Sequence, residues 1–103
     1  MIIKNIYRKS IEEFNSTLTQ DVLKLYILEY LLTHTYVKTV NMAKDIINKQ
    51  FGIDWRYCDY NTYVNSITHK MIRIMINLKK SGIVERYSPR VYKVVKKNIK
   101  IFN

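Results

Sequence analysis

The residues best suited to chemistry in this chain lie along one stretch, residues 61–81. On a helix of about 3.6 residues per turn, this stretch forms an apolar stripe with a polar face opposite it. That face combines hydroxyls, amides, an imidazole and cations, which hydrogen-bond to a ligand and attract anions. The set favours recognition over bond-making chemistry. Its members are Thr62, Asn65, Ser66, His69, Arg73, Asn77 and Lys80.

The sequence contains no catalytic or metal-binding constellation. It has no glycine-rich phosphate loop and no nucleophile motif, and the adjacent carboxylates Glu12 and Glu13 are typical of a solvated helix face. His69 has neither His34 nor the single cysteine, Cys58, near it in sequence, so a zinc site is not predicted. We therefore expect that the protein is not an enzyme and uses no metal and no cofactor.

Positive charge is concentrated in the last third of the chain. The formal net charge is +10; residues 70–103 hold ten Lys and Arg against Glu85 alone, whereas residues 1–69 hold eight basic and seven acidic side chains. A field of this kind suits a polyanion, with nucleic acid first and an acidic membrane surface second. A basic surface that serves only solubility is the alternative interpretation.

The length of 103 residues predicts a single domain. No apolar run approaches the ~20 residues of a membrane-spanning helix. Residues 1–14 contain acidic side chains and no apolar signal-peptide core. We expect a soluble cytoplasmic protein with no membrane partner.

Two helices and a short strand are expected to precede the 61–81 helix. A Thr-x-x-Gln capping box that begins at Thr17 predicts a helix over about 18–34. Residues 35–38 are β-branched and aromatic, which is enough for one short strand. Thr39 is the expected N-cap of a second helix, over about 40–50. Gly52 ends that helix in our prediction, and Asp59 or Asn61 caps the next one.

A strand pair is expected directly after the 61–81 helix. Gly82 stops the helix, because glycine tolerates the left-handed backbone of a C-terminal cap. The Val-, Ile- and Tyr-rich segments 83–87 and 91–96 are typical of strands. Ser88-Pro89 between them predicts a turn, since proline presets the backbone angle of a turn's second position. The sequence therefore predicts a small hairpin on a basic background.

The first sixteen residues form an extension with a helical apolar stripe of its own. This stripe lies outside the minimal domain and needs cover, so we expect a homodimer that it holds together, with a possible contribution from the tail, 98–103. The predicted dimerisation residues are Ile3, Tyr7, Ile11 and Phe14.

The order helix, short strand, helix, helix, strand, turn, strand resembles the winged helix-turn-helix domains of small prokaryotic and viral transcription regulators, archaeal-virus proteins among them. The residues that carry the resemblance are LKKSGIVER from Leu78 to Arg86 and RVYKV from Arg90 to Val94. The resemblance implies one winged-helix domain with its core over 17–97. The expected fold is mainly α with a small β-hairpin, an α+β class.

The resemblance also implies a function. The third helix, about 61–81, would enter the major groove of double-stranded DNA as the recognition helix of a transcription regulator, and the wing, 83–96, would touch the backbone or the minor groove. For a viral protein the compartment would be the host cytoplasm. The residues predicted to contact DNA are Thr62, Tyr63, Asn65, Ser66, His69, Lys70, Arg73, Arg86, Arg90 and Lys93.

The side chains of this set agree with that function independently of the resemblance. Asn65 suits an adenine edge, and Arg73 or Lys70 suits a guanine edge or a phosphate. His69 is predicted as a DNA contact or as a plain exposed histidine, with the choice left open. A protein-interaction module that keeps the winged-helix scaffold and a basic surface is the alternative function.

Overall fold

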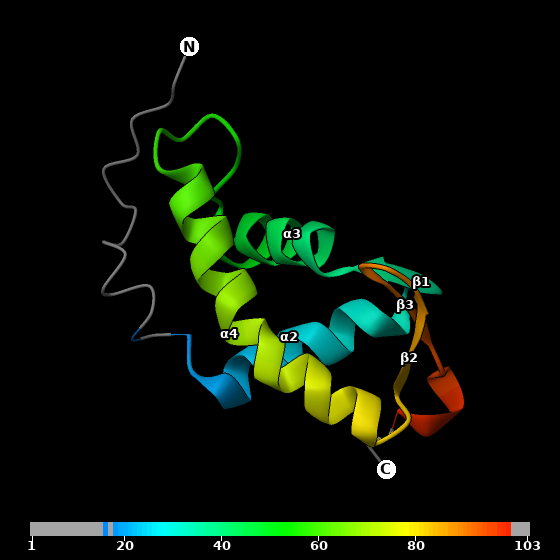
Figure 1. Cartoon of the computed structure of the whole chain (residues 1–103). Coiled ribbons are helices and arrows are strands. Elements are labelled where there is room, and N and C mark those ends of the chain that lie inside the picture. The colour runs from blue at the N-terminus through cyan, green and yellow to red at the C-terminus, as the bar shows by residue number, and fades with distance from the viewer. Residues whose placement is uncertain (1–15, 17, 100–103) are drawn as a thin grey trace.

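The computed structural model describes residue 16 and residues 18–99 (Figure 1). Three helices and a small sheet make up this part of the chain, and a short 3-10 turn follows the last strand. The elements are α2 (Gln20–Leu32), β1 (Tyr36–Lys38), α3 (Thr39–Phe51), α4 (Tyr60–Lys80), β2 (Val84–Ser88), β3 (Val91–Val94) and η1 (Lys96–Asn98).

The fold class expected from the sequence is confirmed: the chain is α+β, with three helices beside an antiparallel sheet in a winged-helix-like arrangement. The sheet has three strands in the order β1-β3-β2, so the hairpin gains β1 as a third strand. Val37 of β1 and Arg86 of β2 both pair with Tyr92 of β3. In Figure 1, α3 lies between the N-terminal half of α4 and the sheet.

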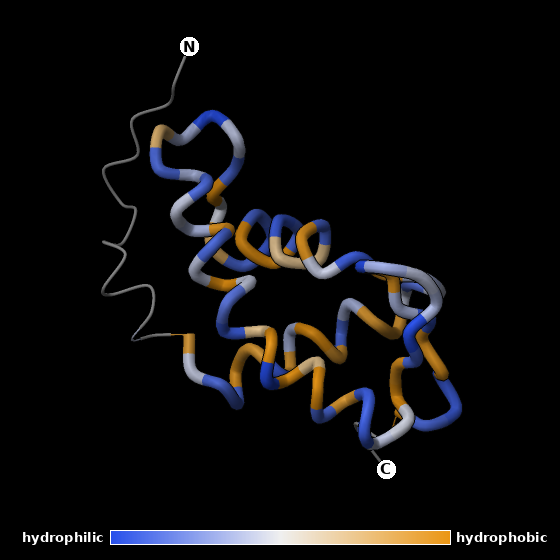
Figure 2. Tube along the Cα trace, viewed as in Figure 1, coloured by the Kyte–Doolittle hydropathy of each residue, from blue (hydrophilic) through white to orange (hydrophobic). Residues whose placement is uncertain are grey.

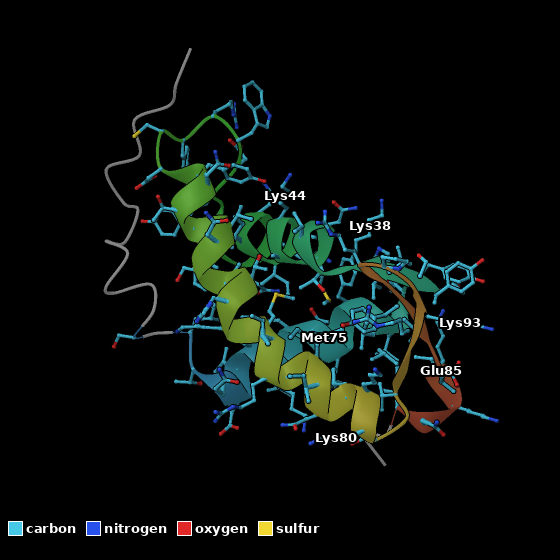
Figure 3. All side chains as sticks on the ribbon, viewed as in Figure 1. Lys38, Lys44, Met75, Lys80, Glu85 and Lys93 are labelled. Carbon is cyan, nitrogen blue, oxygen red and sulfur yellow. The ribbon has the colours of Figure 1, made fainter. Side chains whose placement is uncertain are left out.

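The apolar stripe of α4 lies in the core, as its spacing predicts. Ile67 and Met71 are fully buried, and Leu78 is almost so. Hydrophobic segments of α2, α3 and α4 meet in the space between the three helices (Figure 2). Met75 points into that interior (Figure 3). Because one side of α4 is fixed against the core, its opposite side faces outward along the whole helix.

Gly82 ends α4 and redirects the chain into the hairpin, as predicted. It has φ +77°, and its N–H donates to the carbonyl of Lys79 at 3.1 Å. The N–H of Ile83 donates to the carbonyl of Leu78 at 3.0 Å, which completes a Schellman motif. Asn98 of η1 donates its side-chain amide to the Gly82 carbonyl at 2.8 Å. This bond therefore holds η1 against the turn.

The predicted cap of α2 is displaced by two residues. The helix begins at Gln20, and Thr19 is its N-cap, with a hydroxyl that accepts from the N–H of Val22 at 3.3 Å. The Gln20 side chain instead donates to the carbonyl of Lys70 on α4, at 3.3 Å. In the predicted capping box, Gln20 would bond to the backbone of its own helix, whereas in the structure it bonds to α4. Thr17, the other member of the predicted box, lies outside the described residues.

The predicted cap of α3 is wrong, and its predicted end is right. Thr39 is the first residue of the helix, and Lys38 occupies the N-cap position without a side-chain capping bond. Lys38 keeps the extended backbone of β1, so the strand passes into the helix with no residue between them. Gly52 ends α3 in the left-handed conformation, with φ +68°.

Candidate nucleic-acid interface

The outward face of α4 carries the seven polar residues predicted for it, and six of them have exposed side chains. The exposed six are Thr62, Asn65, His69, Arg73, Asn77 and Lys80, and Ser66 is half-buried. They lie three or four residues apart along the helix, so they form one continuous face. The face offers a hydroxyl, an amide, an imidazole and a guanidinium to a ligand.

Two residues predicted as DNA contacts are turned away from that face. Tyr63 is only 1% exposed and belongs to the core, so it is not part of the outward face. Lys70 lies on the side of α4 that meets the start of α2, where its ammonium donates to the carbonyl of Leu18 at 2.9 Å. Partial burial lowers the pKa of Lys70. Lys70 therefore holds two helices together.

The sequence did not single out two isoleucines that lie in the middle of the outward face. Ile72 is 52% exposed and Ile76 is 49% exposed. They line a shallow depression of about 530 Å³ together with His69, Arg73, Asn77 and Lys80. The outward face is thus polar at its N-terminal half and partly apolar at its C-terminal half. An apolar group of a partner, such as a thymine methyl or a protein side chain, fits this second half.

The tip of the hairpin is a two-residue turn of Pro89 and Arg90 between the paired residues Ser88 and Val91. Arg90 has φ +68° and is the one non-glycine residue with a positive φ among the described residues. Proline at the second position and a left-handed residue at the third are the features of a type II turn. The predicted turn at Ser88-Pro89 is confirmed, and its strained position is occupied by an arginine.

A cavity of about 740 Å³ lies between this tip and the start of α3. Lys38, Arg86 and Arg90 are the three basic residues that line it. Figure 3 shows Lys38 at the junction of β1 and α3. The sequence prediction included both arginines and missed Lys38, because only the pairing of β1 with β3 brings Lys38 to the hairpin tip.

Lys93, the third cation predicted for the wing, lies on the other face of the sheet. Side chains alternate along a strand, and Lys93 follows Tyr92, which pairs with Arg86. Lys93 is opposite Glu85 on one side and Tyr36 on the other. Figure 3 shows Lys93 and Glu85 on the outer side of the sheet. Arg86 and Arg90 therefore line one cavity, and Lys93 does not line it.

The connector before α4 is held by an internal ion pair. The Asp54 carboxylate accepts from the backbone N–H of Arg56 at 3.0 Å and pairs with its guanidinium at 2.6 Å. The side-chain and backbone hydrogen bonds from Arg56 lower the pKa of Asp54, and the side-chain bond to Asp54 raises the pKa of the Arg56 guanidinium. Trp55 between them is 76% exposed. This connector presents an aromatic side chain beside the N-terminal end of α4.

Within the described residues there is no cluster of three or more His, Cys, Asp or Glu that would hold a metal ion. No described helix is both long and apolar enough to cross a membrane. The predicted dimerisation residues, Ile3, Tyr7, Ile11 and Phe14, lie outside the described part of the chain, as do residues 100–103. Ile99 of the tail is described, and it packs partly buried against the core.

Comparison with known proteins finds no matching family model, no matching curated protein and no matching solved structure. The class of protein therefore rests on the element order and the strand order. A helix, a strand, two helices and a closing hairpin, with the first strand added beside the last, define a winged-helix-like domain.

Proposed function

We propose that this protein binds double-stranded DNA in a sequence-specific manner and acts as a transcription regulator in the cytoplasm, or in the host cytoplasm if it is viral. The observation that carries the proposal is the outward face of α4, where hydrogen-bonding side chains and a cation are exposed on a winged-helix-like frame. The concentration of charge in residues 70–103 supports it, because phosphate attraction supplies much of the affinity for DNA. We propose a binding role and no enzyme activity.

Base reading in this proposal belongs to residues 65–73 of α4. Asn65, His69 and Arg73 are exposed on one face, and their side chains carry the donors and acceptors that match base edges in the major groove. Thr62 and Ser66 flank them and suit phosphates or bases near the start of the helix, where the helix dipole favours anions.

Phosphate attraction belongs to the hairpin tip. Arg86 and Arg90 share one cavity wall with Lys38, so three positive charges act at one place. Lys93 faces the other way and stands opposite Glu85, so its contribution to DNA affinity is smaller than that of Arg90. This division differs from the one expected from sequence, in which all three wing cations were equivalent.

A shift assay with a salt titration tests the proposal. A sequence selected from a random DNA pool should bind more tightly than mixed-sequence duplex. The logarithm of the affinity should fall linearly with the logarithm of the salt concentration, by about 0.9 for each phosphate contacted. The absence of duplex binding even at low salt would exclude the proposed function.

We also propose that the active species is a homodimer held by the N-terminal stripe at Ile3, Tyr7, Ile11 and Phe14. Its two DNA half-sites would then lie about one helical turn apart, roughly 34 Å. Sedimentation over a concentration series measures the association, and Phe14→Ser should shift it toward the monomer. A monomer at every accessible concentration would remove the dimer from the proposal.

A second function is favoured by Ile72 and Ile76, which expose about half of their surface in the middle of the outward face. In a protein-interaction module these side chains would anchor a partner, since apolar groups framed by polar ones are typical of such surfaces. Replacing Ile76 with Ser separates the two functions. A DNA reader should keep most of its affinity for duplex, whereas a protein-interaction module would lose its partner.

A further inference from the structure

The cavity at the hairpin tip is built from segments that are distant in sequence. Lys38 comes from the end of β1, Arg86 from β2, and Arg90 from the turn. Its volume of about 740 Å³ is comparable with that of small-molecule sites. Val40 and Tyr92 add apolar surface to the wall. The cavity is therefore a preformed concave surface that combines three cations with apolar contact.

The positive charge of this cavity is not compensated from within. None of the described residues that line it is acidic. Glu85, the single acidic residue in the last third of the chain, lies opposite Lys93 on the outer face of the sheet. Asp45 of α3 lines a different depression, beside His34. Among the described residues, no carboxylate therefore lines this cavity to neutralise its three basic side chains, and these can attract an external anion.

The geometry of the cations favours one class of anion. The guanidinium of Arg86 lies 6.0 Å from the centre of the Tyr92 ring, a cation–π contact that orients it. Arginine presents a planar fork that matches two oxygens of a phosphate, and lysine adds a point charge. Three basic residues at one place suit a ligand group that carries more than one negative charge. A phosphoryl group can carry two negative charges, whereas a single carboxylate carries one.

We propose that this cavity is a phosphate-binding site. The phosphoryl group has two possible sources with the same chemistry: the backbone of DNA or a phosphorylated small molecule such as a nucleotide. Binding of the DNA backbone rests on the proposed function, and it would place a phosphate contact of the DNA in this cavity. The second source is independent of DNA, and it would compete with DNA for the same cations.

Binding of inorganic pyrophosphate and of adenosine diphosphate to the full chain is measured by calorimetry, and the site is located by NMR from the amides of residues 38–40 and 89–92. We expect both probes to shift those amides. Lys38→Gln and Arg90→Gln should each weaken binding by at least about tenfold, since hydrogen bonds to charged groups are worth about 1.5–3 kcal/mol. The matched control is Lys97→Gln, which removes an exposed cation of η1 that does not line the cavity and should leave binding within about twofold.

A competition between adenosine diphosphate and mixed-sequence duplex identifies the source. If adenosine diphosphate displaces the duplex from the cavity amides, the site binds both the DNA backbone and phosphorylated small molecules. Perturbation by duplex alone assigns it to the DNA backbone. Pyrophosphate binding at these amides without any duplex binding would leave the site intact and remove the proposed function. Unperturbed cavity amides with every probe, or an equal loss in Lys97→Gln and Arg90→Gln, would overturn the phosphate site.

Discussion

The outward face of α4 and the tip of the hairpin present different kinds of side chain. The helix face offers neutral hydrogen-bonding groups and two isoleucines, with Arg73 and Lys80 as the cations among them. The tip offers three cations around one cavity and no acidic side chain among its described lining. Neutral polar groups distinguish one base edge from another, whereas cations attract any phosphate. The comparison assigns discrimination to the helix and attraction to the tip.

The two regions also differ in what determines their orientation. The face of α4 is set by a local period, because its apolar stripe must be buried. The tip is set by strand pairing over more than fifty residues, since Lys38 reaches it only through the pairing with Val91. The following predictions test whether the two regions behave as differently as they are built.

The largest expected effect concerns the two sides of α4. Ile67 is fully buried, and Ile72 on the same helix is 52% exposed. Ile67→Ala should lower the free energy of unfolding by about 2–5 kcal/mol. Ile72→Ala, the matched control, should change it by no more than about 0.5 kcal/mol. Denaturant unfolding measures both. A large, concentration-dependent loss in Ile72→Ala would mean that another copy of the chain covers the outward face.

The next effect concerns the division between helix and tip on DNA. Asn65→Ala should reduce the preference for selected over mixed-sequence DNA by about 1–3 kcal/mol, because a base-reading contact is lost. Arg90→Ala should weaken both duplexes equally and lower the salt slope by about one unit. Both variants are measured on both DNAs across a salt series. Loss of specificity in Arg90→Ala, with none in Asn65→Ala, would reverse the assignment.

A smaller effect concerns the turn that joins the two regions. A Cβ at Gly82 would face left-handed backbone strain and would lie 3.3 Å from the side-chain nitrogen of Asn98, which already bonds to the Gly82 carbonyl. At Gly52 the φ is similar, but there is open space. Gly52→Ala should therefore cost about 1 kcal/mol, the strain alone, and Gly82→Ala should cost more. Equal melting temperatures for the two variants would contradict the contact with η1.

Much of this fold is predictable because its signals are local. The stripe of α4, the two helix-ending glycines and the Ser88-Pro89 turn all follow from spacing and from residue type, and each is present in the structure. The caps were predicted less well. The Gln20 side chain donates a hydrogen bond to the carbonyl of Lys70 on α4, so it does not complete a capping box. Because β1 passes into α3 without a break, Thr39 lies inside the helix and does not cap it.

The candidate site is less predictable than the fold. Tyr63 and Lys70 have polar tips, so a sequence pattern places them among polar residues. Each also has a large apolar body, however, and bodies of this kind are commonly buried while the tip finds a partner. Lys38 was missed because no local pattern connects it to the hairpin. The exposed face of a helix can thus be predicted from the sequence except for the residues at its edges. A site formed by strand pairing can be recognised only from the tertiary structure.

The smallest effect separates the backbone role of Arg90 from its charge. Arg90 is held at φ +68°, a conformation that glycine adopts without cost and that other residues adopt at a cost of about 1–2 kcal/mol. Arg90→Gly should therefore raise the free energy of unfolding, by up to about 1 kcal/mol once the greater freedom of glycine in the unfolded chain is included. Arg90→Ala removes the same charge but keeps the strain, so its stability should stay close to that of the original chain. Both variants should lose duplex affinity to the same extent, because both lose one phosphate contact. We expect Arg90→Gly to be the more stable variant and both variants to bind duplex equally. That result would show that Arg90 lowers the stability of the fold while its charge increases the affinity for DNA. Equal stabilities would instead mean that the turn is unstrained, and the charge at the tip would then carry no cost to the fold.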